Sequence, residues 1–231
     1  MQNFSKGYDL LPPSSDIVFK MLFGDERNTD ILIAFLRAVL ALPDDEFKEI
    51  TLMNPFLANE YPDEKVSILD VKAKTHSGKR IDIEIQVKNH AAFSERIVCY
   101  TARMLTEQGG EGTHYRDICP VVSIVITYFR LIDNEHYHNR YRLYDSQTKS
   151  ELTDLVEIHI LEPLKLPRTK PIKDEKLRLW MKFLQAKNRE EMDMLAKLDP
   201  DIKKTVVKLA VLSADEKARM IHDARVKAAL D

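Results

Sequence analysis

Apolar and polar residues alternate strictly over Ile81–Lys88, where every odd position is apolar and every even position is polar. This period of two is typical of a β-strand with one buried face. The preceding segment 67–74 alternates less cleanly, and a turn containing Gly78 separates the two, so the pattern predicts a β-hairpin. A turn centred there pairs residues whose numbers sum to about 154–156, which places Asp70 opposite Glu84 or one position from it.

The rest of the chain shows helical spacing before and after this hairpin, together with two further strand-like segments. Helices are predicted over 16–42 with a break at Gly24, from Ser94 to the glycines at 109–110, and over 174–230 with breaks near 199–200 and 213–215. Segments 119–130 and 155–161 are predicted as strands, the first of them covered on both faces. The order of these elements predicts an α/β or α+β fold with a mixed sheet.

Composition narrows the class of protein. The chain has 231 residues, of which 44% are hydrophobic and 31% are charged with both signs balanced, so it is long enough to bury a core and is not typical of a disordered chain. No apolar stretch is long enough for a membrane span or shaped as a signal peptide. Only Cys99 and Cys119 are present, and we expect buried structural thiols in a reducing compartment. The expectation is a soluble cytoplasmic protein with no membrane partner.

The charge is unevenly distributed along the chain. Residues 1–163 carry 18 Lys and Arg against 26 Asp and Glu, whereas residues 164–231 carry 17 against 11. An acidic body is not typical of a dedicated nucleic-acid-binding domain. It is compatible with an enzyme that gathers carboxylates around a metal ion, and the basic C-terminal part is explained as well by a solvated helical surface.

The polar face of the hairpin holds the most informative side chains. It brings together Asp70, Glu84, Gln86 and Lys88, with Asp82 and Lys72 beside them. Opposed carboxylates raise each other's pKa unless a cation lies between them, and Mg²⁺ binds such carboxylates while completing its shell with water and phosphate oxygens. The alternative is an ordinary solvated strand face, on which the lysines simply pair with the acids.

Several ordered motifs carry a resemblance to a known family. Asp70, followed after a glycine turn by Ile-Glu-Ile-Gln at 83–86, resembles the D…(D/E)-x-K core of the PD-(D/E)XK nuclease superfamily, with Gln86 at the Lys position. Within it, the chain is similar to the recombination-promoting nuclease (Rpn)/transposase family over about residues 15 to 184. The matching segments are 16–24, 69–73, 78–86, 118–124 and 159–162, with Arg96, Tyr100, Gln108, Gly112 and Tyr115 at the family's spacing.

This resemblance implies a restriction-endonuclease-like α/β core with a mixed β-sheet flanked by helices, plus C-terminal helices. Residues 1–165 would form the nuclease-like core, including the N-terminal helices, and residues 166–231 a C-terminal helical extension. The implied activity is that of a Mg²⁺-dependent DNA endonuclease, a hydrolase of phosphodiester bonds linked to recombination or mobile DNA, in which Mn²⁺ can replace Mg²⁺. No three-carboxylate integrase core is present, which favours a nuclease over a true transposase.

The resemblance also implies roles for individual residues. Asp70 and Glu84 would bind the metal ion together with the backbone carbonyl of Ile85, and Gln86 would stand where the superfamily usually has a catalytic Lys. Because Gln carries no charge, it orients water or phosphate only through hydrogen bonds. The charge that it lacks could come from three lysines, Lys88, Lys72 or Lys20.

Other residues have both a functional and a plain structural interpretation. Asp16 and Lys20 lie one helical turn apart and could approach the site, while Asp16 is equally suited to capping a helix. Arg96, Tyr100 and Arg103 share a helix face that could contact DNA, or they could serve ordinary packing and surface pairing. The histidines at 136 and 138 are better explained by a plain polar loop than by a metal site, since no third ligand lies at a recognisable spacing.

Two other functions remain open from the sequence. Gln86 and the acidic body are compatible with a degenerate module that binds nucleic acid or protein without cutting, and a nuclease acting on RNA leaves the same pattern. The C-terminal helices could mediate a homodimer, contact DNA or only cover the core.

Overall fold

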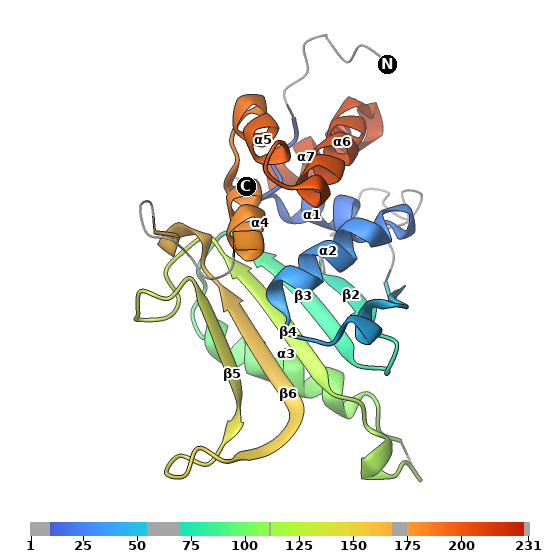
Figure 1. Ribbon diagram of the computed structural model, residues 1–231, viewed down its shortest axis with the longest axis vertical. Coiled ribbons are helices and arrows are strands. Elements are labelled where there is room, and N and C mark those ends of the chain that lie inside the picture. The colour runs from blue at the N-terminus through green and yellow to red at the C-terminus, as the bar shows by residue number, and fades with distance from the viewer. Residues whose placement is uncertain (1–9, 55–69, 111, 168–174, 229–231) are drawn as a thin grey trace. The chain divides into compact units, whose positions relative to one another are not determined.

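The structure is a computed structural model that describes residues 10–54, 70–110, 112–167 and 175–228. The chain forms two compact units, one made of residues 1–39 with 172–231 and the other of residues 40–171 (Figure 1). Within the described residues, no helix combines the length and the apolar character that a membrane span requires.

Unit 40–171 is built on a six-stranded sheet with the order β1-β2-β3-β4-β6-β5. The strands are β1 (Thr51–Leu52), β2 (Val71–Lys74), β3 (Arg80–Gln86), β4 (Val121–Thr127), β5 (His138–Tyr144) and β6 (Glu151–Leu161). The β3–β4 and β4–β6 pairs are parallel and the other three are antiparallel. The mixed sheet confirms the predicted α/β fold class.

The predicted hairpin is present as β2 and β3. Val71 lies opposite Ile83 and Lys72 opposite Asp82, so the paired numbers sum to 154, as the turn position predicts. The start of the predicted first strand, residues 67–69, falls outside the described residues. Gly78 shapes the turn with a φ of 91°, and a Cβ at this position would lie 2.9 Å from the Cys119 sulfur. Both the backbone conformation and the close approach therefore require glycine there.

Helix α3 (Phe93–Thr106) packs against β4 and β6 and covers one face of the sheet (Figure 1). Phe93 and Ile97 from the helix join Val125 and Ile160 from the two strands in one buried cluster. All seven residues of β4 are buried, which confirms the prediction of a central strand covered on both faces.

Two sequence-based expectations in this unit are wrong. His138 does not lie in a loop; it opens β5, an edge strand that the sequence did not reveal because six of its seven residues are polar or charged, or aromatic with a polar group. His136 does lie in the preceding loop. The thiols are also not buried, since Cys99 is exposed and Cys119 is half-buried.

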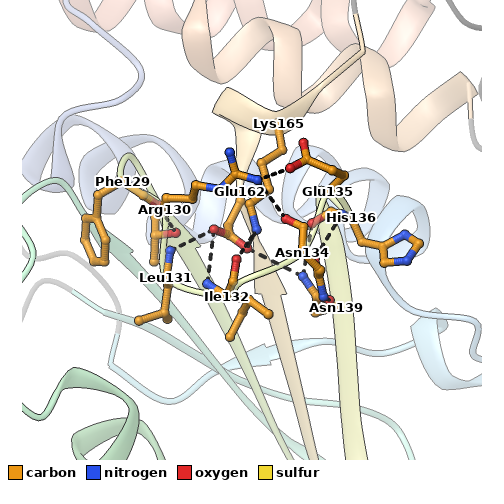
Figure 2. A network of polar contacts seen from close by, with 11 residues as sticks. Phe129, Arg130, Leu131, Ile132, Asn134, Glu135, His136, Asn139, Glu162 and Lys165 are labelled. Carbon is orange, nitrogen blue, oxygen red and sulfur yellow. Dashed lines mark hydrogen bonds and ion pairs between the residues drawn. The ribbon is translucent and has the colours of Figure 1, made fainter.

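A buried ion pair between Glu162 and Lys165 links the loop between β4 and β5 to the end of β6, as Figure 2 shows. The Glu162 carboxylate accepts hydrogen bonds from the backbone N–H of Leu131 (2.8 Å) and from the Lys165 ammonium (2.6 Å). The same ammonium donates to the carbonyl of Ile132, and both side chains are at least 95% buried. The loop thus has internal partners for its backbone groups.

The unit made of residues 1–39 and 172–231 contains the remaining helices. These are α1 (Asp16–Phe23), α2 (Thr29–Val39), α4 (Glu175–Gln185), α5 (Arg189–Ala196), α6 (Pro200–Ala214) and α7 (Glu216–Ala228). The short 3₁₀ turn Glu26–Asn28 belongs to this unit, whereas three others belong to unit 40–171, namely Asp44–Phe47, Tyr115–Asp117 and Pro163–Lys165. The predicted helix breaks at Gly24, at 199–200 and at 213–215 are confirmed. The break between α4 and α5 was not predicted, although Asn188 marks it by capping α5.

The core of this second unit is aromatic. Phe19 and Phe23 of α1 stack at 4.4 Å, and Phe35 and Trp180 join them from α2 and α4. The N-terminal helices therefore belong to the same compact unit as the C-terminal helices. Whether residues 1–165 suffice as a nuclease core stays a prediction, because compactness alone does not say which part of the chain is sufficient for activity.

Candidate active site

The candidate site lies on the polar face of the β2–β3 hairpin. Glu84 is in register with Val125, which packs against α3, so the even-numbered side chains of β3 point to the side of the sheet that carries this helix. Asp82 lies on the same face opposite Lys72, and Asp70 directly precedes β2 with only 6% of its surface exposed. The structure therefore brings together the carboxylates that the sequence singled out, with Asp82 among them.

The carboxylates of this cluster affect the pKa values of Asp82 and Glu84. Burial, followed by the nearby negative charge of Asp70, raises the pKa of Asp82 to about 8. Burial also raises the pKa of Glu84, with a further contribution from Asp70 that Arg96 opposes. The raised pKa favours the protonated form of Asp82, which limits the repulsion inside the cluster.

Lys72 supplies one compensating charge. Its ammonium lies 3.3 Å from a carboxylate oxygen of Asp70. Burial by itself would lower the pKa of Lys72, but the charges of Asp70 and Asp82 outweigh burial and raise it. Lys72 is thus a fixed cation at the edge of the cluster.

Arg96 supplies the second compensating charge from the first turns of α3. Its Nη2 donates to Oε1 of Glu84 at 2.8 Å and to Oε1 of Gln86 at 3.2 Å. The guanidinium also lies over the rings of Phe93, at 4.7 Å, and Tyr100, at 5.9 Å. The sequence suggested Arg96 as a DNA contact or as part of a surface pair, whereas here it contacts the two residues at the centre of the predicted motif.

The remaining predicted site residues of this unit lie at the end of β3 and on α3. The side-chain amide of Gln86 donates to the backbone carbonyl of Lys88 at 2.9 Å, and Lys88 itself is exposed just beyond the end of β3. Tyr100 is half exposed on α3. Arg103 is exposed and pairs with Glu107 one turn further along the helix.

The two upstream candidates belong to the helical unit. Asp16 is the first residue of α1 and forms an ion pair of 2.6 Å with Arg225 of α7. Its other oxygen accepts a hydrogen bond from the N–H of Ile17. Lys20 is buried within α1. Their approach to the hairpin site stays a prediction.

The oxygen donors of the cluster are of the chemical type that hard divalent cations bind. Oδ1 of Asp82 is buried and accepts no hydrogen bond from the described residues, so a polar atom in the cluster has unused capacity. Carboxylate and carbonyl oxygens are the ligands that Mg²⁺ and Mn²⁺ prefer. In the described part of the chain, no three His, Cys, Asp or Glu side chains are grouped so that they could hold a metal ion. Lys72 and Arg96 instead provide the positive charge.

A comparison with protein families identifies the family of the chain that carries this site. The family model described as PD-(D/E)XK nuclease family transposase matches residues 13–231. The chain belongs to this family. No curated protein and no solved structure matches it. Membership confirms the resemblance that the ordered motifs indicated and identifies the chain as a member of a nuclease family, whose substrates are nucleic acids.

The PD-(D/E)XK motif alone did not reveal the part played by Asp82 or by the Arg96 contact. A signal for Asp82 was available, because the alternation in β3 puts it on the same face as Glu84. No local pattern could have revealed the pairing of Arg96 with Glu84, since the two residues lie on different elements and 12 positions apart.

Proposed function

We propose that this protein is a metal-dependent endonuclease that hydrolyses phosphodiester bonds in DNA. The observation that carries the proposal is the meeting of Asp70, Glu84 and Gln86 on one face of adjacent strands in a chain of a PD-(D/E)XK nuclease family. Asp70 and Glu84 would hold Mg²⁺, or Mn²⁺ in its place, together with the backbone carbonyl of Ile85. When bound, such an ion polarises the phosphodiester and lowers the pKa of an attacking water.

Gln86 and Arg96 share the task that a lysine performs in the general motif. The Gln86 amide can donate a hydrogen bond to water or phosphate but carries no charge. The Arg96 guanidinium beside it carries a permanent charge and several donors, and it suits the oxygens of a phosphate. We infer that Arg96 exchanges Glu84 for a phosphate oxygen when substrate binds and there stabilises the negative charge that develops during hydrolysis.

The family's description as transposases supports a role in recombination or in the movement of DNA. Two other functions share the same site. A nuclease acting on RNA would use the same carboxylates, and a binding module without cleavage is favoured by Gln86 in place of Lys and by the ion pair that engages Glu84.

Nicking of supercoiled plasmid with and without Mg²⁺ or Mn²⁺ tests the proposal, using wild-type protein beside Asp70→Asn and Glu84→Gln. We expect metal-dependent relaxation that both substitutions abolish. Equal activity in wild type and variants would point to a contaminant or another site. An absence of cleavage by folded protein with either metal would favour the binding module, and matched DNA and RNA strands distinguish the two nuclease classes.

A further inference from the structure

Beside the carboxylates, the hairpin carries a pair of cations that the proposed chemistry does not use. Lys74 at the end of β2 lies directly opposite Arg80 at the start of β3. Both occupy even-numbered positions, so they share the face of Asp82 and Glu84. Lys74 is exposed and Arg80 is half-buried, which leaves their charged ends open to a ligand.

This pair is electrostatically unfavourable by itself. Like charges directly opposite each other on neighbouring strands destabilise a sheet. The next cross-strand pair along the hairpin shows the opposite arrangement, because Lys72 faces Asp82 and contacts Asp70. Within the described ranges, by contrast, no carboxylate forms an ion pair with Lys74 or Arg80. An anion held between the two cations would remove the repulsion.

We propose that Lys74 and Arg80 bind a second backbone phosphate of the nucleic-acid substrate, on the same strand as the scissile one. Arg80 lies four residues from Glu84 along β3, or about 13 Å at the rise of a strand. A nucleic-acid strand that lies along the hairpin would thus have one phosphate at the carboxylates and another at this cation pair. Lys and Arg are the usual phosphate ligands of proteins that track a nucleic-acid backbone. This inference rests on the proposed function.

The hairpin offers a substitution that separates phosphate binding from a merely structural role. In Lys74→Glu the new carboxylate faces Arg80, so the cross-strand repulsion becomes an attraction and the melting temperature should stay equal or rise. The same change should weaken binding of the phosphate backbone. A structural role for Lys74 also predicts weaker binding, but together with a lower melting temperature.

Binding is measured by fluorescence anisotropy with matched labelled DNA and RNA strands, in an Asp70→Asn, Glu84→Gln background that cannot cleave them. The matched control is Lys149→Glu, which makes the same change of charge in the turn between β5 and β6, next to the edge strand β5. We expect Lys74→Glu to lower the affinity about tenfold and to reduce the slope of log K against log salt by about 1. Lys149→Glu should leave both nearly unchanged.

Equal losses in Lys74→Glu and Lys149→Glu would overturn the inference, because only net charge would then matter. A lower melting temperature of Lys74→Glu would overturn it as well. In the otherwise native protein, Lys74→Glu should raise KM for plasmid while leaving kcat nearly unchanged. If wild type cleaves with the same KM as Lys74→Glu, the phosphate site is wrong and the nuclease stands. If wild type does not cleave and the background variant does not bind, the proposed function itself is wrong.

Discussion

The Nη2 atom of Arg96 bridges Oε1 of Glu84 and Oε1 of Gln86, at 2.8 and 3.2 Å. The positive charge of Arg96 beside the Glu84 carboxylate opposes the binding of a metal ion at the same carboxylate. The same guanidinium contacts Gln86, the residue at the position where the general motif has a lysine. Arg96 should therefore affect metal binding and catalysis in opposite directions.

Replacing Arg96 with Ala is expected to increase the affinity for Mn²⁺ by at least about threefold, since Glu84 loses a competing cation. It should lower kcat by about 10²- to 10³-fold, because the charge that stabilises the transition state is lost. Calorimetric titration of Mn²⁺ and plasmid nicking measure the two effects. Arg96→Lys, which keeps the charge, should retain more activity than Arg96→Ala. A loss of both metal affinity and activity would mean that Arg96 only supports the fold.

Asp82 should make the protein less stable as the pH rises. Its pKa is about 8 in the folded protein and about 4 when unfolded, so the folded state binds the extra proton between these values. Asp82→Asn should therefore gain stability over wild type by up to about 1.4 kcal/mol for each pH unit between about 4 and 8. Urea unfolding at several pH values in EDTA measures this difference. A difference that does not change with pH would contradict the raised pKa.

The buried and exposed ion pairs of Figure 2 should differ sharply in their effect on stability. Glu162→Ala leaves the buried Lys165 ammonium without its carboxylate, and such a change typically costs about 3–5 kcal/mol. Arg130→Ala removes a pair with Glu135 whose side chains are 56% and 85% exposed, and it should cost less than about 1 kcal/mol. Chemical unfolding of the two variants gives both values. Similar losses would show that burial does not control the outcome.

His138 should destabilise the protein as the pH falls. Its Nε2 lies 2.7 Å from Nδ1 of His159, whose other nitrogen lies 2.6 Å from a Glu157 oxygen. Burial, followed by the charges of His159 and Arg140, lowers the pKa of His138 to about 4 from 6.5. The unfolded chain therefore takes up the proton first, and stability should be present above pH 6.5 and decline between about 6.5 and 4.

His138→Gln removes this titration. The free energy of unfolding of the variant should therefore fall less steeply with decreasing pH than that of wild type, by up to about 1.4 kcal/mol for each pH unit in that window. Thermal unfolding from pH 7 to 4 measures it. His136→Gln serves as a control, because it replaces an exposed histidine of the same unit. Parallel curves for wild type and His138→Gln would show that His138 titrates normally.

Local sequence patterns were sufficient to predict the hairpin, its register and the face on which the candidate residues lie. The strict alternation of β3 and the position of Gly78 were sufficient, because a strand's side-chain period is two and a short turn sets which residues pair. The fully apolar β4, the helix breaks and the family motifs were likewise local signals. The mixed sheet and the nuclease family followed from them.

Contacts between residues on different elements could not be predicted in this way, because they depend on tertiary packing. Edge strand β5 escaped detection because its exposed positions carry no alternating apolar pattern. The pairing of Arg96 with Glu84 depends on how α3 packs beside β3, and the raised pKa of Asp82 depends on its burial against Asp70. A periodic pattern tells which face of an element is buried. The distance between two charges and the solvent left between them are set by packing, and these determine the electrostatics of the candidate site.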